Sequence, residues 1–299
     1  MRIFVIIALS ILTALTTITM VLPHAETLTI VYTGNAAGKL ESCGCPNDPY
    51  GGYIERATLM RDLRERESPF LLVDGGQMVS LFGDYAGKAE LVMELMNLMG
   101  YDAAGIEASE LFYGVAGAAP IRRTASFPLL SSSVLDSTGA PAFEPVFIKS
   151  IGDVRVAIIG VTDSTGIDRL VSTRVSDFTL IPPEQAVAGA LDVLSEEYGF
   201  IIILSSLAPS ENEKLLEQFA EIDLIVEVTG NRRYEKPKVL LGGIIVSPGN
   251  GGQFVGLITL DRSAEGVLTV LRHEFLPVLD IPVDDAAAKL LDAYNATLQ

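Results

Sequence analysis

Short apolar runs that alternate with amphipathic segments constrain the fold of this chain more than any other feature. Apolar runs bounded by Gly, Pro, Asn and Asp predict strands, and apolar residues three and four positions apart predict helices. Along most of the chain the two patterns take turns, and toward the end the apolar runs follow one another. This order is typical of an α/β fold with mixed sheets, and we expect two sheets packed face to face with helices outside them.

The expected strands are Leu28–Tyr32, Phe70–Val73, Tyr101–Ile106, Phe127–Leu130, Phe143–Ile151, Val154–Val161, Phe200–Leu204, Ile222–Val228, Val239–Ser247, Phe254–Leu260 and Val267–Leu276. The expected helices are Gly52–Glu67, Lys88–Met99, Pro183–Tyr198, Glu211–Ala220 and Asp284–Thr297. Because neither an internal repeat nor a Pro- or Ser-rich linker interrupts this order, we expect one domain over residues 26–299.

Residues 1–25 have the pattern of an export signal. Arg2 supplies a positive start, Phe4–Leu22 is apolar apart from Ser and Thr, and the small residue Ala25 suits a cleavage site. An uncleaved anchor is the alternative, because the apolar run has about the length that spans a bilayer, roughly 20 residues. In both cases we expect the domain to be exported, to the periplasm or another extracytoplasmic space. It would contact a membrane only if residues 1–25 remain as an anchor.

The formal net charge of −17 limits the partners of the chain. A strongly acidic protein repels nucleic acid and anionic lipid, and it suits a basic partner. We identify no basic cluster in the sequence that would offset this charge, so we expect no nucleic-acid binding.

Several motifs, taken in order, resemble one family. The first expected strand is followed by G-x-x-x-G and then by G-G-x-x-x-R-A-T. After these come V-D-G-G-Q, Y-D-A-A-G-I-E-A-S-E-L-F-Y-G, I-L-S-S-L-A-P-S, D-L-I-V-E-V-T-G-N and I-V-S-P-G-N-G-G-Q-F-V-G. Over nearly all of residues 27–299 this order resembles the 5′-nucleotidase branch of the calcineurin-like metallophosphoesterases. The resemblance implies a four-layer sandwich of two mixed β-sheets flanked by helices, with two metal ions that activate water and bind a phosphate.

The chain departs from that family at the positions that would hold the metals. The family's motifs carry Asp and His after the first strand, a bridging Asp after the second, Asn-His-Glu, a His after Leu-Ser, and Gly-His-x-His. The residues at or near these positions here are Asn35, Ala37, Asp74, Gln77, Ala108, Ser109, Glu110, Ser206 and Asn231. Neutral side chains do not offset the charge of two divalent cations. We therefore expect no metal at this site.

The histidine count leads to the same expectation. The chain has two histidines, His24 in the export signal and His273 in a late expected strand. One distant imidazole cannot build a two-metal hydrolase site. His273 is interpreted as a partly exposed strand residue, and Glu110 as a helix-start or surface carboxylate.

Thr33–Thr58 is the segment in which we expect the function. It is dense in Gly, Asn, Asp and Pro, so it predicts a long loop after the first strand, and it holds both cysteines, Cys43 and Cys45. A disulfide between two cysteines one residue apart closes a very small ring, constrains little chain entropy and is strained. The run E-S-C-G-C-P followed by two glycines further resembles exported members of the superfamily that have a Cys-Gly-Cys loop and altered metal ligands.

The local chemistry predicts a reactive pair. Gly44 permits the tight bend between the two thiols, and we expect Gly51, Gly52 and Arg56 to support the loop. The N-terminus of the helix near Gly52, with Lys39 and Arg56 as local cations, would favour the thiolate. A thiolate beside a resolving cysteine is what thiol–disulfide exchange requires.

The first hypothesis is therefore a thiol–disulfide redox protein on a metallophosphoesterase-like scaffold. Cys43 and Cys45 would be the catalytic residues, no cofactor would be needed, and the partner would be an exported redox protein or a basic cytochrome. One alternative is a non-catalytic module that binds a ligand, a partner or one soft metal ion at the two sulfurs. Hydrolysis of phosphoesters by an altered site and an inert disulfide that fixes the loop are the others.

Overall fold

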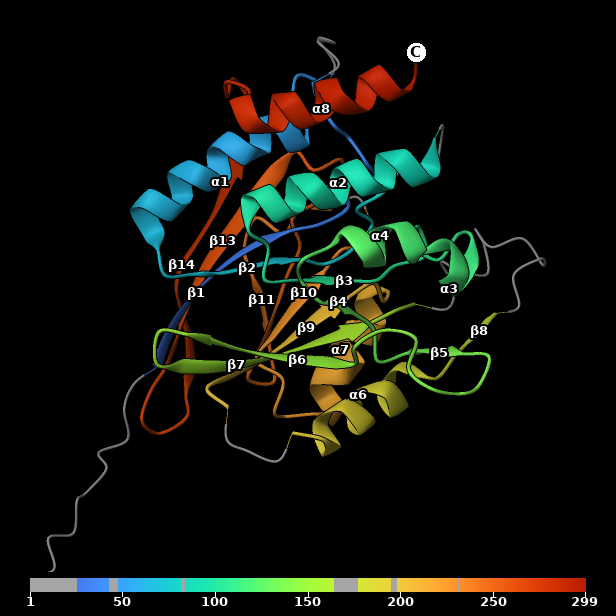
Figure 1. Cartoon of the computed structure of the whole chain (residues 1–299). Coiled ribbons are helices and arrows are strands. Elements are labelled where there is room, and N and C mark those ends of the chain that lie inside the picture. The colour runs from blue at the N-terminus through green and yellow to red at the C-terminus, as the bar shows by residue number, and fades with distance from the viewer. Residues whose placement is uncertain (1–25, 43–47, 82–83, 164–176, 195–197, 231) are drawn as a thin grey trace, which may run out of the picture.

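The computed structural model describes residues 26–42, 48–81, 84–163, 177–194, 198–230 and 232–299. Two six-stranded sheets pack face to face, and helices cover the outer side of each sheet (Figure 1). The α/β class and the four-layer sandwich expected from the sequence are confirmed. Among the described helices, none has the length and apolar character needed to cross a membrane.

The first sheet has the order β14-β13-β1-β2-β3-β4, and the second has the order β11-β12-β10-β9-β7-β6. The first sheet consists of β1 (Glu26–Thr33), β2 (Leu71–Asp74), β3 (Ala103–Gly105), β4 (Leu129–Leu130), β13 (Phe254–Arg262) and β14 (Leu268–Pro277). The second consists of β6 (Val146–Ile151), β7 (Val154–Val161), β9 (Phe200–Ser205), β10 (Leu224–Glu227), β11 (Lys238–Leu240) and β12 (Gly243–Val246). A small ribbon pairs β5 (Val134–Asp136) with β8 (Phe178–Leu180).

Helices pack on the two outer faces. The first sheet is covered by α1 (Tyr53–Glu67), α2 (Tyr85–Met99), α4 (Ala119–Thr124) and α8 (Asp285–Thr297), with the short α3 (Gly114–Gly117) beside α4. The second sheet is covered by α6 (Pro183–Asp192) and α7 (Pro209–Gln218). Figure 1 shows the first group above the sheets and α6 and α7 below them.

The alternation of side chains along each strand explains why the strands are continuous apolar runs. In β2, Leu72 packs under the helices of the first sheet, whereas Leu71 and Val73 face the second sheet. All three are fully buried, because a strand in the middle of a four-layer sandwich has no face exposed to solvent. The core is therefore three apolar layers, one between the sheets and one on each outer side.

Several expected elements shift by up to three residues at an end, and two differ more from the structure. Val239–Ser247 was expected to be one strand, and it is the antiparallel pair β11 and β12, between which the chain reverses at Leu241 and Gly242. These two residues have positive φ values of 51° and 92°, which a tight reversal requires. The helix expected to reach Tyr198 ends at Asp192. The strands β5 and β8 and the helices α3 and α4 were not expected, because each is too short to show a period.

The parallel strands bring their carboxyl ends to one side of the molecule. In the first sheet β1, β2, β3 and β4 are parallel, and in the second sheet β7, β9, β10 and β12 are parallel. In Figure 1, β1, β2, β7 and β9 can be followed from left to right. Loops at such an edge are where α/β proteins place their functional residues.

Candidate functional site

The segments that follow β1 and β2 run side by side. The backbone nitrogens of Asn35, Ala37 and Gly38 donate to the carbonyl oxygens of Gly76, Gln77 and Met78 at 2.8, 2.8 and 2.9 Å. Asn35, Ala37 and Gln77 all have positive φ, at 51°, 48° and 57°, which is uncommon for residues other than glycine. The fold thus brings these three predicted site residues together in a tightly bonded double loop.

Asp74 at the end of β2 is fully buried and holds this region together. It accepts hydrogen bonds from the Thr33 hydroxyl at 2.6 Å and from the backbone nitrogen of Gly76 at 2.9 Å. Burial raises the pKa of Asp74, and its hydrogen bonds and the nearby Arg56 guanidinium oppose that shift. The Thr33 hydroxyl also bonds to the Tyr101 hydroxyl at 2.8 Å, so the carboxylate belongs to a buried polar network.

Glu110 joins the loops after β2 and β3. Its carboxylate accepts from the backbone nitrogens of Met78 at 2.8 Å, Val79 at 3.2 Å and Glu107 at 3.1 Å, and from the Ser109 hydroxyl at 2.8 Å. Burial and the neighbouring Glu107 raise the pKa of Glu110 to about 7. The expectation of a helix-start or surface carboxylate was wrong, because Glu110 is fully buried and bonded to both loops.

The second sheet contributes Ser206 and the chain after β10. The Ser206 hydroxyl accepts from the backbone nitrogen of Asp163 at 2.8 Å, and the Thr229 hydroxyl donates to the Ser206 carbonyl. Asn35 donates through Nδ2 to the Val228 carbonyl at 3.4 Å and so links the loops of the two sheets. The predicted positions on both sheets therefore lie within one connected region.

Val228 fills the space between these loops with an apolar side chain. A Cβ atom added to Gly34 or Gly75 would lie only 2.3 or 2.2 Å from Cγ1 of Val228. Both positions therefore require glycine, and the buried methyl group packs directly against the backbone at the ends of β1 and β2. Nothing in the sequence singles out Val228, because its contacts come from distant parts of the chain.

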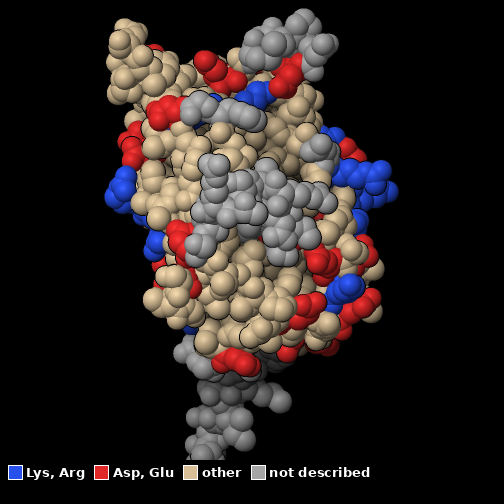
Figure 2. Space-filling model, turned by 90° about the vertical axis from the view of Figure 1, so that its right-hand side faces the viewer, with Lys and Arg blue, Asp and Glu red and all other residues tan. Residues whose placement is uncertain are grey.

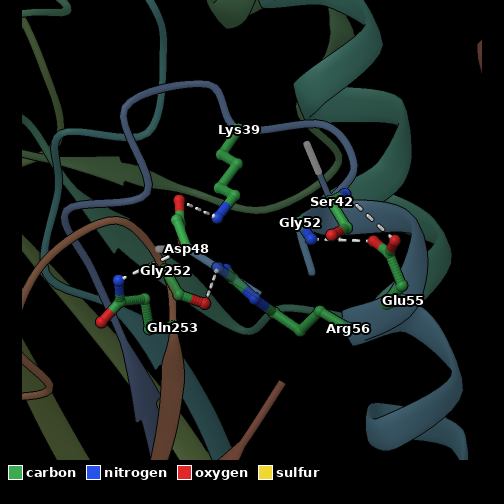
Figure 3. A network of polar contacts seen from close by, with 8 residues as sticks. All are labelled: Lys39, Ser42, Asp48, Gly52, Glu55, Arg56, Gly252 and Gln253. Atoms are coloured by element: carbon green, nitrogen blue, oxygen red, sulfur yellow. Dashed lines mark hydrogen bonds and ion pairs between the residues drawn. The ribbon is translucent and has the colours of Figure 1, made fainter. Parts of the chain in front are cut away.

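Glu55 in the first turn of α1 holds the two ends of the cysteine-containing loop (Figure 3). Its carboxylate accepts from the backbone nitrogen of Gly52 at 2.7 Å and from that of Ser42 at 3.1 Å. A Cβ atom on Gly52 would lie 2.4 Å from the Leu40 carbonyl carbon, so only glycine permits this approach. The spacing of Gly52 and Glu55 matches half of a capping box, a signal from which the sequence could have predicted this role.

An ion pair also spans the loop. Lys39 donates to Asp48 at 2.7 Å, and Gln253 Nε2 lies 3.5 Å from the other carboxylate oxygen of Asp48 (Figure 3). The Lys39 hydrogen bond lowers the pKa of Asp48. Lys39 is therefore already paired, which differs from its expected role as a local cation for the thiols.

Arg56, which was expected to support the loop, is fully buried in α1. Its Nη2 donates to the Gly252 carbonyl at 3.1 Å, and its guanidinium lies 4.7 Å from the centre of the Tyr53 ring. Nε and Nη1 have no hydrogen-bond partner among the described residues. The positive charge of Arg56 is thus enclosed by protein and does not face solvent.

Three groups of predicted site residues can now be distinguished. Asn35, Ala37, Asp74, Gln77, Ser109, Glu110 and Ser206 lie in the connected region described above, and Gly51, Gly52 and Arg56 lie at the base of the loop. Cys43, Gly44, Cys45 and Asn231 fall outside the described residues.

Within the described ranges, no three His, Cys, Asp or Glu side chains come together in a way that could hold a metal ion. Figure 2 shows the face at the right of Figure 1, where described side chains are mostly uncharged and charged groups lie mainly toward the sides.

Comparison with known proteins agrees with this architecture. No protein-family model matches the chain. The snake venom 5′-nucleotidase of Gloydius brevicauda is 33% identical over 150 residues, which are 45% of this chain and 25% of that protein. The calcineurin-like phosphoesterase YfkN of Bacillus subtilis has a TM-score of 0.77 at 18% identity, over 92% of this chain and 98% of that one. The chain is thus similar in part of its sequence to 5′-nucleotidases, and it has the fold of the calcineurin-like metallophosphoesterases.

The likeness to solved structures covers most of this chain. The 5′-nucleotidase precursor of Thermus thermophilus has a TM-score of 0.77 at 24% identity, over 91% of this chain and 59% of that chain. The chain spans about a quarter of the length of the curated 5′-nucleotidases that it matches. The likeness to the solved structures therefore establishes the metallophosphoesterase fold alone.

Proposed function

We propose that this protein is an exported metallophosphoesterase-fold protein in which the Cys43–Cys45 pair carries out thiol–disulfide exchange in place of dinuclear metal chemistry. The observation that carries the proposal is that the loop around the pair is held at both ends without it. Glu55 binds the backbone on both sides of the loop, and Lys39 pairs with Asp48 across it. A disulfide between the two cysteines would constrain the loop little further. A role in thiol chemistry therefore accounts for the pair better than a purely structural disulfide.

The side chains at the metal positions do not fit two divalent cations. Asn35 and Gln77 are neutral amides, Ala37 has no donor, and Ser206 offers a hydroxyl that already accepts a hydrogen bond. The methyl group of Val228 packs between the ends of β1 and β2. Divalent cations of this kind need several carboxylate or imidazole ligands, so the proposed reaction does not use a metal.

The proposed reaction is a two-electron exchange with a dithiol partner. A thiolate of the partner attacks one sulfur of the oxidised Cys43–Cys45 pair, the bond between the two sulfurs breaks, and a mixed disulfide forms. The second partner thiolate then attacks the partner sulfur of that mixed disulfide and releases the reduced pair. Two electrons and two protons pass from the partner to this chain, and the partner leaves with a disulfide.

The charged groups at the two ends of the loop bear on the proposed exchange. Lys39 is paired with Asp48, Arg56 is enclosed, and Glu55 places negative charge at the start of α1. None of these groups supplies a free positive charge to a thiolate. We therefore propose that exchange becomes faster as the pH rises toward about 8.5, the pKa of a free cysteine.

Export and the choice of partner complete the proposal. The N-terminal pattern of residues 1–25 and the relatives named as venom proteins or as a precursor support an extracytoplasmic location. The net charge of −17 favours an exported redox protein that carries its dithiol on a basic surface.

The names of the relatives favour a second candidate, the hydrolysis of nucleoside 5′-monophosphates. One experiment separates the two. The mature protein is assayed for reduction of insulin by dithiothreitol, and for release of phosphate from AMP with Mn²⁺, Zn²⁺ or Co²⁺. We expect exchange that is lost in Cys43→Ser and Cys45→Ser, and no metal-dependent phosphate release. Equal exchange by the double Cys→Ser variant would reject the redox proposal, and metal-dependent hydrolysis of AMP would support the second candidate.

A further inference from the structure

A basic pocket lies beside the site, on the segment that connects β10 and β11. It has a volume of about 440 Å³, and its lining includes Arg232, Arg233, Lys236 and Lys238. This short segment contains one acidic residue, Glu235, although the whole chain has a net charge of −17. The expectation that the chain has no basic cluster was wrong, because these four cations gather around one cavity.

Two of the four cations are held in place. The guanidinium of Arg233 lies 3.7 Å from the centre of the Phe254 ring and forms an ion pair with Glu235. The backbone around it is also fixed, because Tyr234 donates through its nitrogen to the Ser247 carbonyl at 3.2 Å. Lys238 donates to the Tyr234 hydroxyl at 3.1 Å, so the wall of the pocket is already ordered.

The acidic groups near the pocket are engaged by other partners. Glu227 accepts from the Tyr234 hydroxyl at 2.6 Å and from Asn212 Nδ2 at 2.9 Å. Glu213 lies 3.7 Å from the Lys238 ammonium, and Glu235 is paired with Arg233. Each of these carboxylates therefore has a partner of its own.

Arg232 and Lys236 are the cations that remain available. Both are exposed, and in the part of the chain that the structure describes neither has an ion pair or a hydrogen bond from its side chain. The pocket also includes Pro209 in the first turn of α7, a helix start that is already capped by the Glu211 carboxylate, which accepts from the Ala208 nitrogen at 3.2 Å. A planar guanidinium and an ammonium are donors that bind phosphate and sulfate groups in proteins.

We propose that this pocket binds a tetrahedral oxyanion, a phosphate or sulfate group, through Arg232 and Lys236. Its affinity depends on ionic strength, because two exposed cations supply most of the attraction. The proposal does not depend on the chemistry of Cys43 and Cys45, and it predicts that their replacement by Ser leaves anion binding unchanged.

Isothermal titration calorimetry with sodium phosphate and with sodium sulfate, at low ionic strength in a zwitterionic buffer, tests the proposal. The variants are Arg232→Ala/Lys236→Ala and the matched control Arg66→Ala/Lys289→Ala, which removes two exposed cations outside the pocket. We expect saturable binding to the parent, weakened about tenfold or more in the pocket variant and by less than about twofold in the control. The charge-preserving Arg232→Lys/Lys236→Arg variant should keep most of the affinity. Circular dichroism and the melting temperature without ligand check that each variant folds.

Each outcome decides the proposal. Binding of one oxyanion and not the other supports it and identifies the group as phosphate or sulfate. Absence of saturable binding overturns it, as does equal weakening in the pocket and control variants. Acetate that binds as tightly as phosphate or sulfate also overturns it, because the effect would then be a general attraction of anions.

Discussion

Replacing Glu55 with Ala tests how the cysteine-containing loop is held. The carboxylate is 8% exposed and accepts from Gly52 at 2.7 Å and from Ser42 at 3.1 Å. A hydrogen bond to a charged group contributes about 1.5–3 kcal/mol. The short bond to Gly52 falls in that range and the longer one to Ser42 contributes less. We therefore expect the free energy of unfolding to fall by about 2–4 kcal/mol.

The assay is equilibrium unfolding in urea, with alkylation of the thiols measured on the folded, reduced protein. Glu65→Ala on the same helix is the matched control, because Glu65 is exposed and should change stability by less than about 0.5 kcal/mol. We expect Glu55→Ala to lower the midpoint without changing the slope and to speed alkylation of Cys43 and Cys45. If Glu55→Ala and Glu65→Ala behave alike in both measurements, the carboxylate does not hold the loop.

Three further results are expected. Val228→Ala should reduce the free energy of unfolding by about 2 kcal/mol, whereas Val239→Ala at a 64% exposed position should have little effect. Gly75→Ala should cost much less stability in the Val228→Ala background than in the parent. Equal costs in this double-mutant cycle would show that Cγ1 of Val228 is not the reason why residue 75 must be glycine. Because burial raises the pKa of Glu110 from 4.5 to about 7, Glu110 loses its proton at a higher pH in the folded protein than in the unfolded one. The free energy of unfolding should then fall by up to about 3 kcal/mol as the pH rises from 4.5 to 7, and Glu110→Gln should remove that slope in urea titrations at several pH values.

The sequence was enough to predict the layers because the strands are buried on both faces. Val154–Val161 was predicted with the observed bounds, since its neighbours β6 and β9 and the layers above and below leave few of its residues open to solvent. The reversal between β11 and β12 was missed, although Gly242-Gly243 within K-V-L-L-G-G-I-I-V-S is a turn signal, because the run is otherwise apolar. In the structure Leu241 and Gly242 have positive φ, and this local turn separates the two strands.

The sequence indicated which segments form the candidate site, but it did not reveal many of the contacts between their side chains. The structure brings Asn35, Ala37 and Gln77 together in neighbouring loops, because parallel strands end at one edge of the sheet. Sequence spacing could not reveal that Val228 packs against Gly34 and Gly75, or that Lys39 is paired with Asp48. Such contacts join segments whose distance along the chain says nothing about their distance in space.

The equilibrium reduction potential of the Cys43–Cys45 pair tests the central proposal most directly. The mature protein is equilibrated in a series of glutathione buffers, and the free thiols are trapped by alkylation and counted by mass spectrometry. We predict a reversible two-electron transition between about −120 and −270 mV, the range of proteins that exchange disulfides. A pair that remains oxidised below about −300 mV would be a structural disulfide, and thiol–disulfide exchange as the function would be contradicted.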